Sequence, residues 1–305
     1  MQEQVLDHEE IEWQLEAVEL APVENWLNEH PSAAGVDIVP GWARELSDVY
    51  YDTEDWRLYR AAYALRVRNT DGQSAEATMK ALAPAEGGLR RRREISEPIE
   101  GIETLKGIPG PVGERVRRLA GTADLCPLFE VRTRRRTYAL RTQTPSSGEI
   151  VEDASGNIRR QKSAQDAIVV AEIALDESDI FANGGARTNL SRVEVEVGSD
   201  AQIHDGVGDF VEVLREALEL RPTRTSKFRT GLSVAGLSPA VAPDLGPTEI
   251  DATLSCGEVA FAILRRHFAA MLAHEPGVRL GEDPEELHDM RVATRRLRAA
   301  LKLYS

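Results

Sequence analysis

The stretch EEIEWQL, at residues 9–15, alternates between polar and apolar side chains from Glu10 onward. The polar members are Glu10, Glu12 and Gln14, and the apolar members are Ile11, Trp13 and Leu15. Successive side chains of a β-strand point to opposite faces, so this alternation predicts a strand with one charged face and one apolar face.

The same alternation returns downstream and predicts further strands at residues 47–53, 63–69, 75–82, 128–140, 168–175 and 191–197. Two of them again carry like charges two residues apart, Arg66 with Arg68 and Glu194 with Glu196. Short helices are predicted at 22–29 and 112–119, and a longer one, over residues 210–218, ends before Arg221-Pro222. The polar, turn-rich segment 143–165 predicts a hairpin tip.

The charged strand faces allow two interpretations. An antiparallel sheet with one face in solvent gives the same alternation. However, two acidic strands and at least one Arg-rich strand carry purely charged faces, which favours a closed sheet with these faces inside. Charges in such an interior need compensation, which a divalent cation on the carboxylates and a polyanion on the arginines would provide.

The composition narrows the class of protein. The 305 residues carry a formal net charge of -14, so a general nucleic-acid binder, which needs a basic surface, is not expected. No apolar run is long enough to span a membrane, and the acidic N-terminus lacks the order of a signal peptide. The two cysteines, Cys126 and Cys256, fit a reducing compartment, and a cytoplasmic protein is the expectation.

Eight short motifs then follow one another in the order of a known family. They are EEIEWQ at 9–14, YYDTEDWRL at 50–58, YALRVRN at 63–69, TMKAL at 78–82, RRRRE at 90–94, RTRR at 132–135, AEIALD at 171–176 and VEVEV at 193–197, with SKF at 226–228 after them. In this order they resemble the CYTH, or triphosphate tunnel metalloenzyme, superfamily. The resemblance implies an α+β fold built on a closed antiparallel tunnel of eight strands with flanking helices. It also implies hydrolysis of inorganic or thiamine triphosphate, or cyclisation of ATP, with Mg²⁺ or Mn²⁺.

Position by position, the resemblance assigns roles to the charged residues. Metal ligation falls to Glu10, Glu12, Glu172, Glu194 and Glu196, of which Glu10, Glu12 and Glu196 are the expected catalytic set. The triphosphate would be held by Gln14, Arg66, Arg68, Lys80, Arg92, Arg134 or Arg135, and Lys227, with Glu94 as a further candidate. One departure is Gln14, which stands where the family has a lysine, so a positive charge beside the substrate is lost.

The last part of the chain has a different character. Residues 231–250 are rich in Gly, Pro, Ala and Ser and predict a linker, and two helices follow. The second begins with Asp283 as N-cap and Pro284 at its first position, with Glu286 completing a capping-box-like pattern, and runs to the end of the sequence. Its expected core-facing stripe is Leu287, Met290, Thr294, Leu297 and Leu301. A basic stripe beside it consists of His288, Arg291, Arg295, Arg298 and Lys302.

The segment HDMRVATRRLRAAL, at 288–301, resembles the opening of the CHAD domain, a helical bundle associated with polyphosphate binding. The expected organisation is a tunnel domain at 1–230, a linker at 231–250 and the N-terminal fragment of a CHAD domain, cut after its first two helices, at 251–305. The leading hypothesis is a metal-dependent triphosphatase coupled to a polyphosphate-binding module, with no membrane partner. Binding of polyphosphate or nucleotide without turnover, and less favoured adenylyl cyclase activity, are the alternatives.

Overall fold

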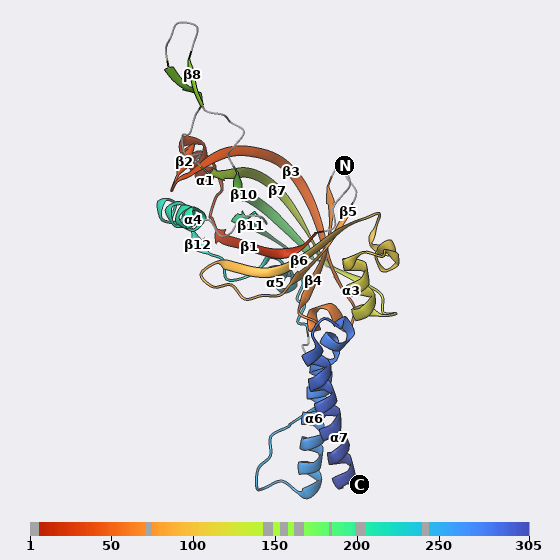
Figure 1. The fold of residues 1–305 in the computed structure, drawn as a ribbon. Coiled ribbons are helices and arrows are strands. Elements are labelled where there is room, and N and C mark those ends of the chain that lie inside the picture. Colours follow the sequence, from red (N-terminus) through yellow and green to blue (C-terminus); the bar gives the residue numbers. More distant parts are fainter. Residues whose placement is uncertain are drawn as a thin grey trace.

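In a computed structural model the strands curl into a tunnel from which a helical hairpin projects (Figure 1). The structure describes residues 6–70, 75–142, 149–152, 158–161, 168–182, 185–198, 205–239 and 244–304.

Eight antiparallel strands form the tunnel wall. They are β1 (Leu6–Glu16), β3 (Val36–Asp52), β4 (Tyr63–Thr70), β5 (Ala75–Ala81), β6 (Leu89–Ile99), β7 (Cys126–Thr142), β10 (Val169–Ala182) and β11 (Arg187–Val197). Their order around the wall is β11-β10-β7-β3-β4-β5-β6-β1, and β1 pairs back with β11, where Trp13 lies opposite Val195. The predicted closed sheet is therefore confirmed.

Smaller elements decorate the wall. The short strands are β2 (Ser32–Ala33), β12 (Arg221–Pro222) and the two-stranded hairpin of β8 (Glu149–Glu152) and β9 (Ile158–Gln161). The helices are α1 (Ala21–Glu29), α2 (Arg57–Arg60), α3 (Pro111–Ala120), α4 (Asp205–Ala217) and α5 (Lys227–Val234), with a 3₁₀ turn η1 (Ile102–Gly107). The β8–β9 hairpin falls within the predicted tip at 143–165, and the remaining residues of that segment lie outside the described ranges.

Two strands differ from what the sequence pattern predicted. The strand predicted at 47–53 is the end of the 17-residue β3, which begins at Val36 and shifts register between Pro40 and Ala43. Gly41 permits this bend, because a Cβ atom there would lie 2.4 Å from Thr137 Oγ1. The four arginines at 90–93 belong to β6, whose sequence shows no alternation that would predict a strand.

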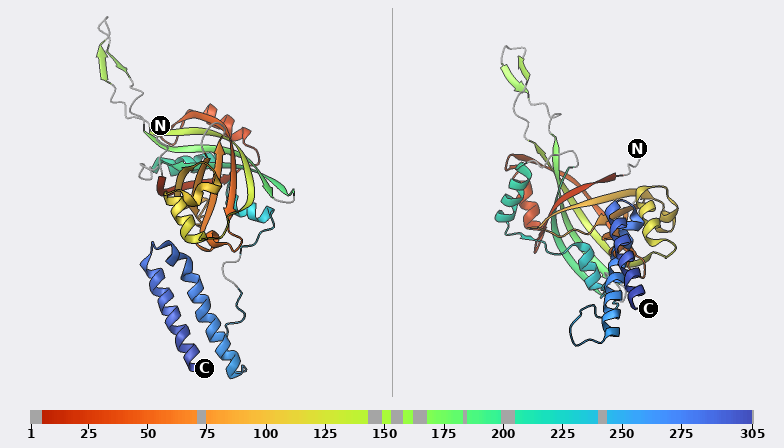
Figure 2. Two further views of the ribbon diagram at one scale, coloured as in Figure 1. Left: turned by 90° about the vertical axis from the view of Figure 1, so that its right-hand side faces the viewer. Right: turned by 60° about the horizontal axis from the view of Figure 1, so that its bottom comes forward.

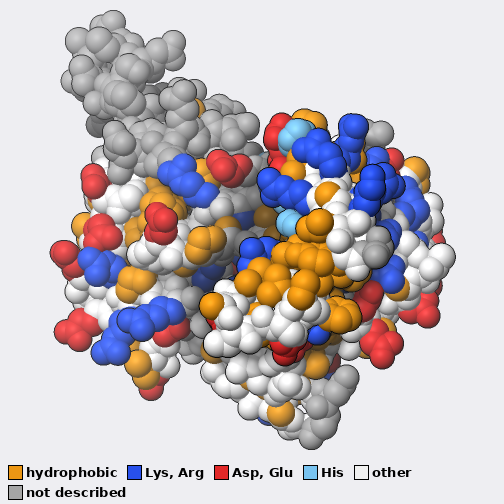
Figure 3. Space-filling view, turned by 90° about the horizontal axis from the view of Figure 1, so that it is seen from below, with side chains coloured by type: hydrophobic (Ala, Val, Ile, Leu, Met, Phe, Trp, Pro, Cys, Tyr) orange, Lys and Arg blue, Asp and Glu red, His pale blue; other side chains and the backbone are white. Residues whose placement is uncertain are grey.

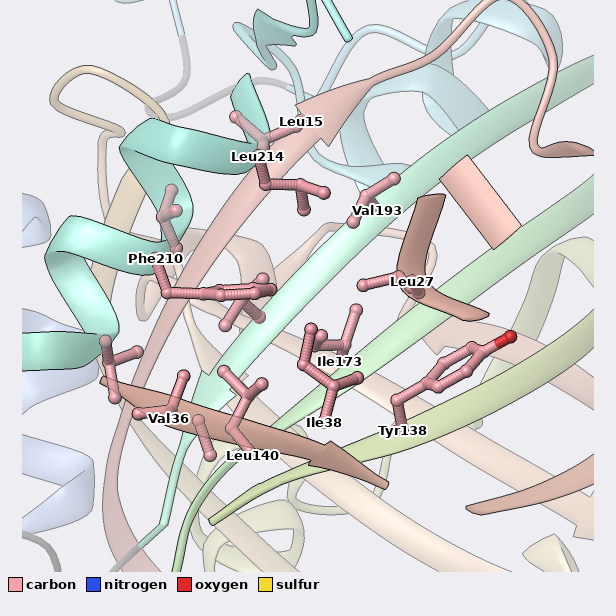
Figure 4. Close-up of a cluster of buried hydrophobic side chains, with 14 of the residues drawn as sticks. Leu15, Leu27, Val36, Ile38, Tyr138, Leu140, Ile173, Val193, Phe210 and Leu214 are labelled. Carbon is pink, nitrogen blue, oxygen red and sulfur yellow. The ribbon is translucent and has the colours of Figure 1, made fainter. Parts of the chain in front are cut away.

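The apolar faces of the strands point away from the tunnel and are covered by helices. Phe210 and Leu214 of α4 pack on Ile173 and Val193, as Figure 4 shows. On another side, α3 covers β4, β5 and β6, where Val116 belongs to the same buried cluster as Met79 and other apolar residues. Burial of these apolar side chains against helices leaves the charged faces to line the interior.

The C-terminal hairpin consists of α6 (Cys256–Leu280) and α7 (Pro284–Tyr304), two antiparallel helices seen side by side in Figure 2. Asp283 Oδ1 accepts a hydrogen bond from the Glu285 amide at 2.9 Å, as expected of an N-cap. Glu286 bonds with His274 of α6 instead of completing a capping box.

The predicted core-facing stripe of α7 was partly wrong. Leu287 and Leu301 are 48% and 52% exposed, while Ala293 and Ala300 are buried. The helix is therefore rotated by about one residue relative to the prediction, so that the side with Ala293 and Ala300 faces α6. Small alanines allow the two helices to approach closely. Seen from below, hydrophobic side chains form a continuous area next to clustered Lys and Arg side chains (Figure 3).

The hairpin contacts the tunnel domain through its connecting turn. Leu280 is buried in the cluster under α3, and Arg118 donates to its carbonyl at 2.6 Å. Glu282 pairs with Arg115 at 2.5 Å and with Arg93 at 2.8 Å. The predicted linker starts later than expected, since α5 continues to Val234 and Leu232 packs in the core. No described helix is long and apolar enough to cross a membrane.

Candidate functional site

The tunnel interior divides into an acidic and a basic wall. The acidic wall comes from the neighbouring strands β10, β11 and β1, and its carboxylates are Glu10, Glu12, Glu172, Asp176, Glu194 and Glu196. The basic wall comes from β4, β5 and β6 and carries Arg66, Arg68, Lys80, Arg90 and Arg92. A cavity of about 160 Å³ lies between the two walls and is lined by most of these residues. Side chains distant in sequence thus face one small volume.

A row of carboxylates crosses the acidic wall. Glu196 lies opposite Glu12 on β1 and opposite Glu172 on β10, so three adjacent strands contribute one acid each. Burial and the nearby carboxylate of Glu10 raise the pKa of Glu196 to about 7, although its side chain is open to the lumen. Burial, opposed by Arg92 and reinforced by Glu10, raises the pKa of Glu12 to about 7. The row therefore holds more negative charge than its neighbours compensate.

Glu10 differs from this row because cations surround it. Lys80 Nζ lies 2.7 Å from Glu10 Oε1, and Arg92 Nε lies 2.7 Å from Oε2. Burial disfavours the charged carboxylate, but Lys80 and Arg92 outweigh it and hold the pKa of Glu10 well below its usual range. Arg92 also reaches Glu12 at 2.5 Å, and Lys80 pairs with Glu94. These pairs place the predicted residues Lys80 and Arg92 directly at the acidic wall.

A second ion-pair cluster lies around Asp176, which is fully buried. Arg135 donates to both oxygens of Asp176, at 2.7 Å and 2.6 Å, and to Glu194 at 2.8 Å. Lys227 of α5 also contacts Asp176 and lies 3.0 Å from Glu194. Asp176 was not predicted as a site residue, although it stands four residues after Glu172 on the same strand face.

Asp48 also belongs to the tunnel site, because its carboxylate lines the cavity. Asp48 accepts from Arg68 at 2.7 Å and 2.8 Å, and Arg66 lies 3.9 Å away. Burial opposes its charge, but Arg66 and Arg68 hold its pKa well below the usual range. Asp52, by contrast, stabilises the YYDT turn by accepting a hydrogen bond from the amide of Leu58 at 3.0 Å.

Gln14 occupies the place of the family lysine between two acids. Its Nε2 donates to Glu12 at 2.9 Å and to Glu194 at 3.5 Å. Its Oε1 accepts from Arg90 Nε at 3.0 Å. A neutral side chain therefore bridges two carboxylates and one guanidinium, which no lysine could do because it has no acceptor.

The choice between Arg134 and Arg135 is decided by strand direction. Arg135 points into the tunnel, whereas the side chain of Arg134 is 66% exposed and pairs with Glu177 outside at 3.0 Å. Of the two arginines, only Arg135 therefore lines the tunnel cavity. The basic residues of α7 that were predicted to bind polyphosphate lie on the exposed side of the hairpin, apart from the tunnel cavity.

The carboxylate row fits a hard divalent cation. Glu196 has no cation within ion-pairing distance among the residues that the structure describes, and all donors in the row are oxygens. Oxygen donors are the ligands that Mg²⁺ and Mn²⁺ prefer. With the ion pairs in place, no described group of three His, Cys, Asp or Glu residues has ready-made metal-binding geometry.

Comparison with known proteins agrees with this architecture. The model of the CYTH domain matches residues 27–231. The chain belongs to the CYTH family. The model of the CHAD domain matches residues 262–305, after the CYTH part, so the suspected CYTH-CHAD organisation is confirmed. No curated protein sequence matches this CYTH chain significantly.

Solved structures similar to the CYTH tunnel share little sequence with it. The HpAC1 protein of Hippeastrum, reported to have a dominant triphosphatase activity, is 17% identical, with a TM-score of 0.48 over 76% of this chain and 98% of that one. The bh2851 protein of Bacillus halodurans, described in connection with adenylate cyclase, is 17% identical, with a TM-score of 0.44 over 73% and 97%. An RNA triphosphatase of S. pombe is 14% identical, with a TM-score of 0.28 over 76% and 83%.

Proposed function

We propose that the tunnel hydrolyses a phosphoanhydride bond of inorganic triphosphate or a related short polyphosphate, with Mg²⁺ or Mn²⁺ as cofactor. The observation that carries this proposal is the division of one cavity into an acidic wall and a basic wall. A chain of phosphates with bound divalent cations carries charges that complement both walls. Membership of the CYTH family supports the same chemistry.

Five carboxylates would hold the cation, namely Glu10, Glu12, Glu172, Glu194 and Glu196. When bound, the cation would polarise the phosphorus–oxygen bonds and increase the acidity of a water molecule. Lys80 and Arg92, which pair with Glu10 in the free protein, would then turn to phosphate oxygens. Arg66, Arg68, Arg135 and Lys227 would hold the other phosphates, because their side chains line the same cavity.

This exchange would keep the charge of Glu10 compensated. In the free protein Lys80 and Arg92 neutralise Glu10, and in the complex the metal and the phosphates would replace the two halves of these pairs. Because neither state leaves Glu10, Lys80 or Arg92 without a partner, binding would avoid the penalty of several kcal/mol that an isolated buried charge would cost. In the reaction, water adds to a terminal phosphorus and the remaining phosphate chain leaves.

The test is phosphate release from inorganic triphosphate by the full chain, with Mg²⁺ or Mn²⁺ and with EDTA. Glu196→Gln should lower the rate by more than about 10-fold, as a lost metal ligand would. Glu177→Gln is the matched control, because Glu177 lies on the neighbouring strand but points outward to Arg134. Equal rates in the two variants would refute the assignment of the carboxylate site.

Binding without turnover is the second candidate, and the contacts of Gln14 favour it. A neutral amide between Glu12 and Glu194 provides no charge for a developing phosphate. Calorimetric binding of triphosphate without phosphate release would support this reading. Formation of cyclic AMP and pyrophosphate from ATP would instead support the adenylyl cyclase alternative.

We further propose that the basic stripe of α7 binds polyphosphate. Its members, His288, Arg291, Arg295, Arg298 and Lys302, are all exposed on the hairpin. Replacing Arg291, Arg295 and Arg298 together by Gln should weaken binding of long polyphosphate, while phosphate release from triphosphate stays unchanged. An unchanged affinity for long polyphosphate would refute this role. A cytoplasmic location remains our prediction.

A further inference from the structure

Helix α4 carries a line of negative charge on its exposed side, away from the tunnel interior. Asp209, Glu212, Glu216 and Glu219 recur at steps of three, four and three residues, from α4 into the turn that follows it, and all four are exposed. Residues three and four apart are neighbours on a helix surface, so these acids form one acidic stripe. The opposite side of α4 is buried in the core through Phe210.

The acidic stripe is poorly compensated within its own chain. Of its members, Glu212 alone has a cation within ion-pairing distance in the described structure, namely Arg215 at 2.5 Å. Like charges three or four residues apart destabilise a helix. Negative charge near a helix C-terminus does so too, and Glu216 is the last residue but one of α4. A positive surface from outside would remove this cost.

The basic stripe of α7 has the complementary property. Arg291, Arg295 and Arg298 are exposed, and none of them has a carboxylate within ion-pairing distance among the residues that the structure describes. They too are like charges at steps of four and three residues, and no acid occurs between Met290 and Ser305 to separate them. Each stripe therefore lacks the charge that the other one carries.

The two stripes also match in length and spacing. With a rise of 1.5 Å per residue, the four acids and the four cations from Arg291 to Lys302 each span about 15–17 Å. Laid antiparallel, the stripes put Asp209 opposite Lys302, and the other three acids then come opposite the three arginines. Figures 1 and 2 show α4 against the tunnel and α7 on the projecting hairpin, so the stripes do not meet within one chain.

We propose that the acidic stripe of one copy binds the basic stripe of α7 in a second copy of this chain. Polyphosphate fits the basic stripe but is repelled by the acidic one, so the acidic stripe requires a basic protein surface. The net charge of -14 makes whole copies repel, but salt screens charges beyond about 8 Å, whereas touching stripes attract. Because the two surfaces differ, the contact is head-to-tail and repeats from copy to copy. It does not involve the tunnel and is independent of the proposed hydrolysis.

The test is sedimentation of the full chain over a range of protein concentrations. At low salt the average mass should rise beyond that of a dimer, and it should return to that of the monomer at 1 M NaCl, where the screening length falls to about 3 Å. Two double variants change the middle of each stripe, Glu212→Lys with Glu216→Lys and Arg295→Glu with Arg298→Glu. Each should weaken self-association by about 10-fold or more, because two of the four charge contacts become repulsive.

A 1:1 mixture of the two double variants decides the question. The reversed charges of one variant then face those of the other, so association should return to the level of the wild type. Arg132→Glu with Arg134→Glu is the matched control, because both arginines are exposed and lie on β7 rather than on either stripe, and it should associate like the wild type. A wild type that stays monomeric at low salt, or a mixture that associates no better than each variant alone, would overturn the proposal.

Discussion

Replacing Asp176 by Asn tests whether the ion pairs of the tunnel stabilise the free protein. Asp176 is fully buried and accepts both hydrogen bonds of Arg135 as well as one from Lys227. Asn keeps the shape but removes the charge, which leaves two buried cations to share Glu194. Removing one partner of a buried ion pair costs about 3–5 kcal/mol. Because Glu194 still compensates part of the charge, we expect the free energy of unfolding to fall by about 3 kcal/mol.

The assay is urea unfolding followed by tryptophan fluorescence. All 4 tryptophans lie between residues 13 and 56, so the signal reports the tunnel domain. With a slope of about 3 kcal/mol per M, the midpoint should fall by about 1 M. Asp179→Asn is the control, because its partner Arg187 is 60% exposed and such a pair contributes at most about 1 kcal/mol. Equal urea midpoints for Asp176→Asn and Asp179→Asn would refute this prediction.

Three further predictions concern stability. Asp48 should make the protein acid-sensitive: its pKa is lowered in the folded state, so its contribution is fully present above its ordinary pKa of 3.8 and is lost as the pH falls below that value. Tm measured from pH 6 to pH 3 should fall less steeply for Asp48→Asn, and parallel curves would contradict this. Asp52→Ala should lower the free energy of unfolding by about 2–3 kcal/mol, because the amides of the turn lose a buried acceptor; a loss below about 0.5 kcal/mol in urea unfolding would speak against it. Leu280→Asp should detach the helical hairpin without unfolding the tunnel, since a charge would replace an apolar side chain under α3. Limited proteolysis should then cleave between the two parts more rapidly than in wild type, and equal cleavage rates would argue against the contact.

Alternation of side chains along single strands was enough to predict much of the tunnel. Glu10, Glu12 and Gln14 were assigned to one face because the period of a strand is fixed by its backbone geometry. The same local rule separated Glu194 and Glu196 from the valines between them. It failed where the periodicity was broken, as at Pro40-Gly41 in β3, or absent, as in the four arginines of β6.

What only the tertiary structure decided is which charges meet. Closure of β1 on β11 brings Glu12 beside Glu196, a contact between residues far apart in sequence that no local pattern encodes. Closure also turned Asp48 and Asp176 into tunnel residues and excluded Arg134, since strand register determines which side of the wall each side chain occupies. The sequence by itself determined that charged faces exist and that they belong to strands. Their pairing follows from the three-dimensional closure of the sheet, because electrostatic partners are set by distance in space.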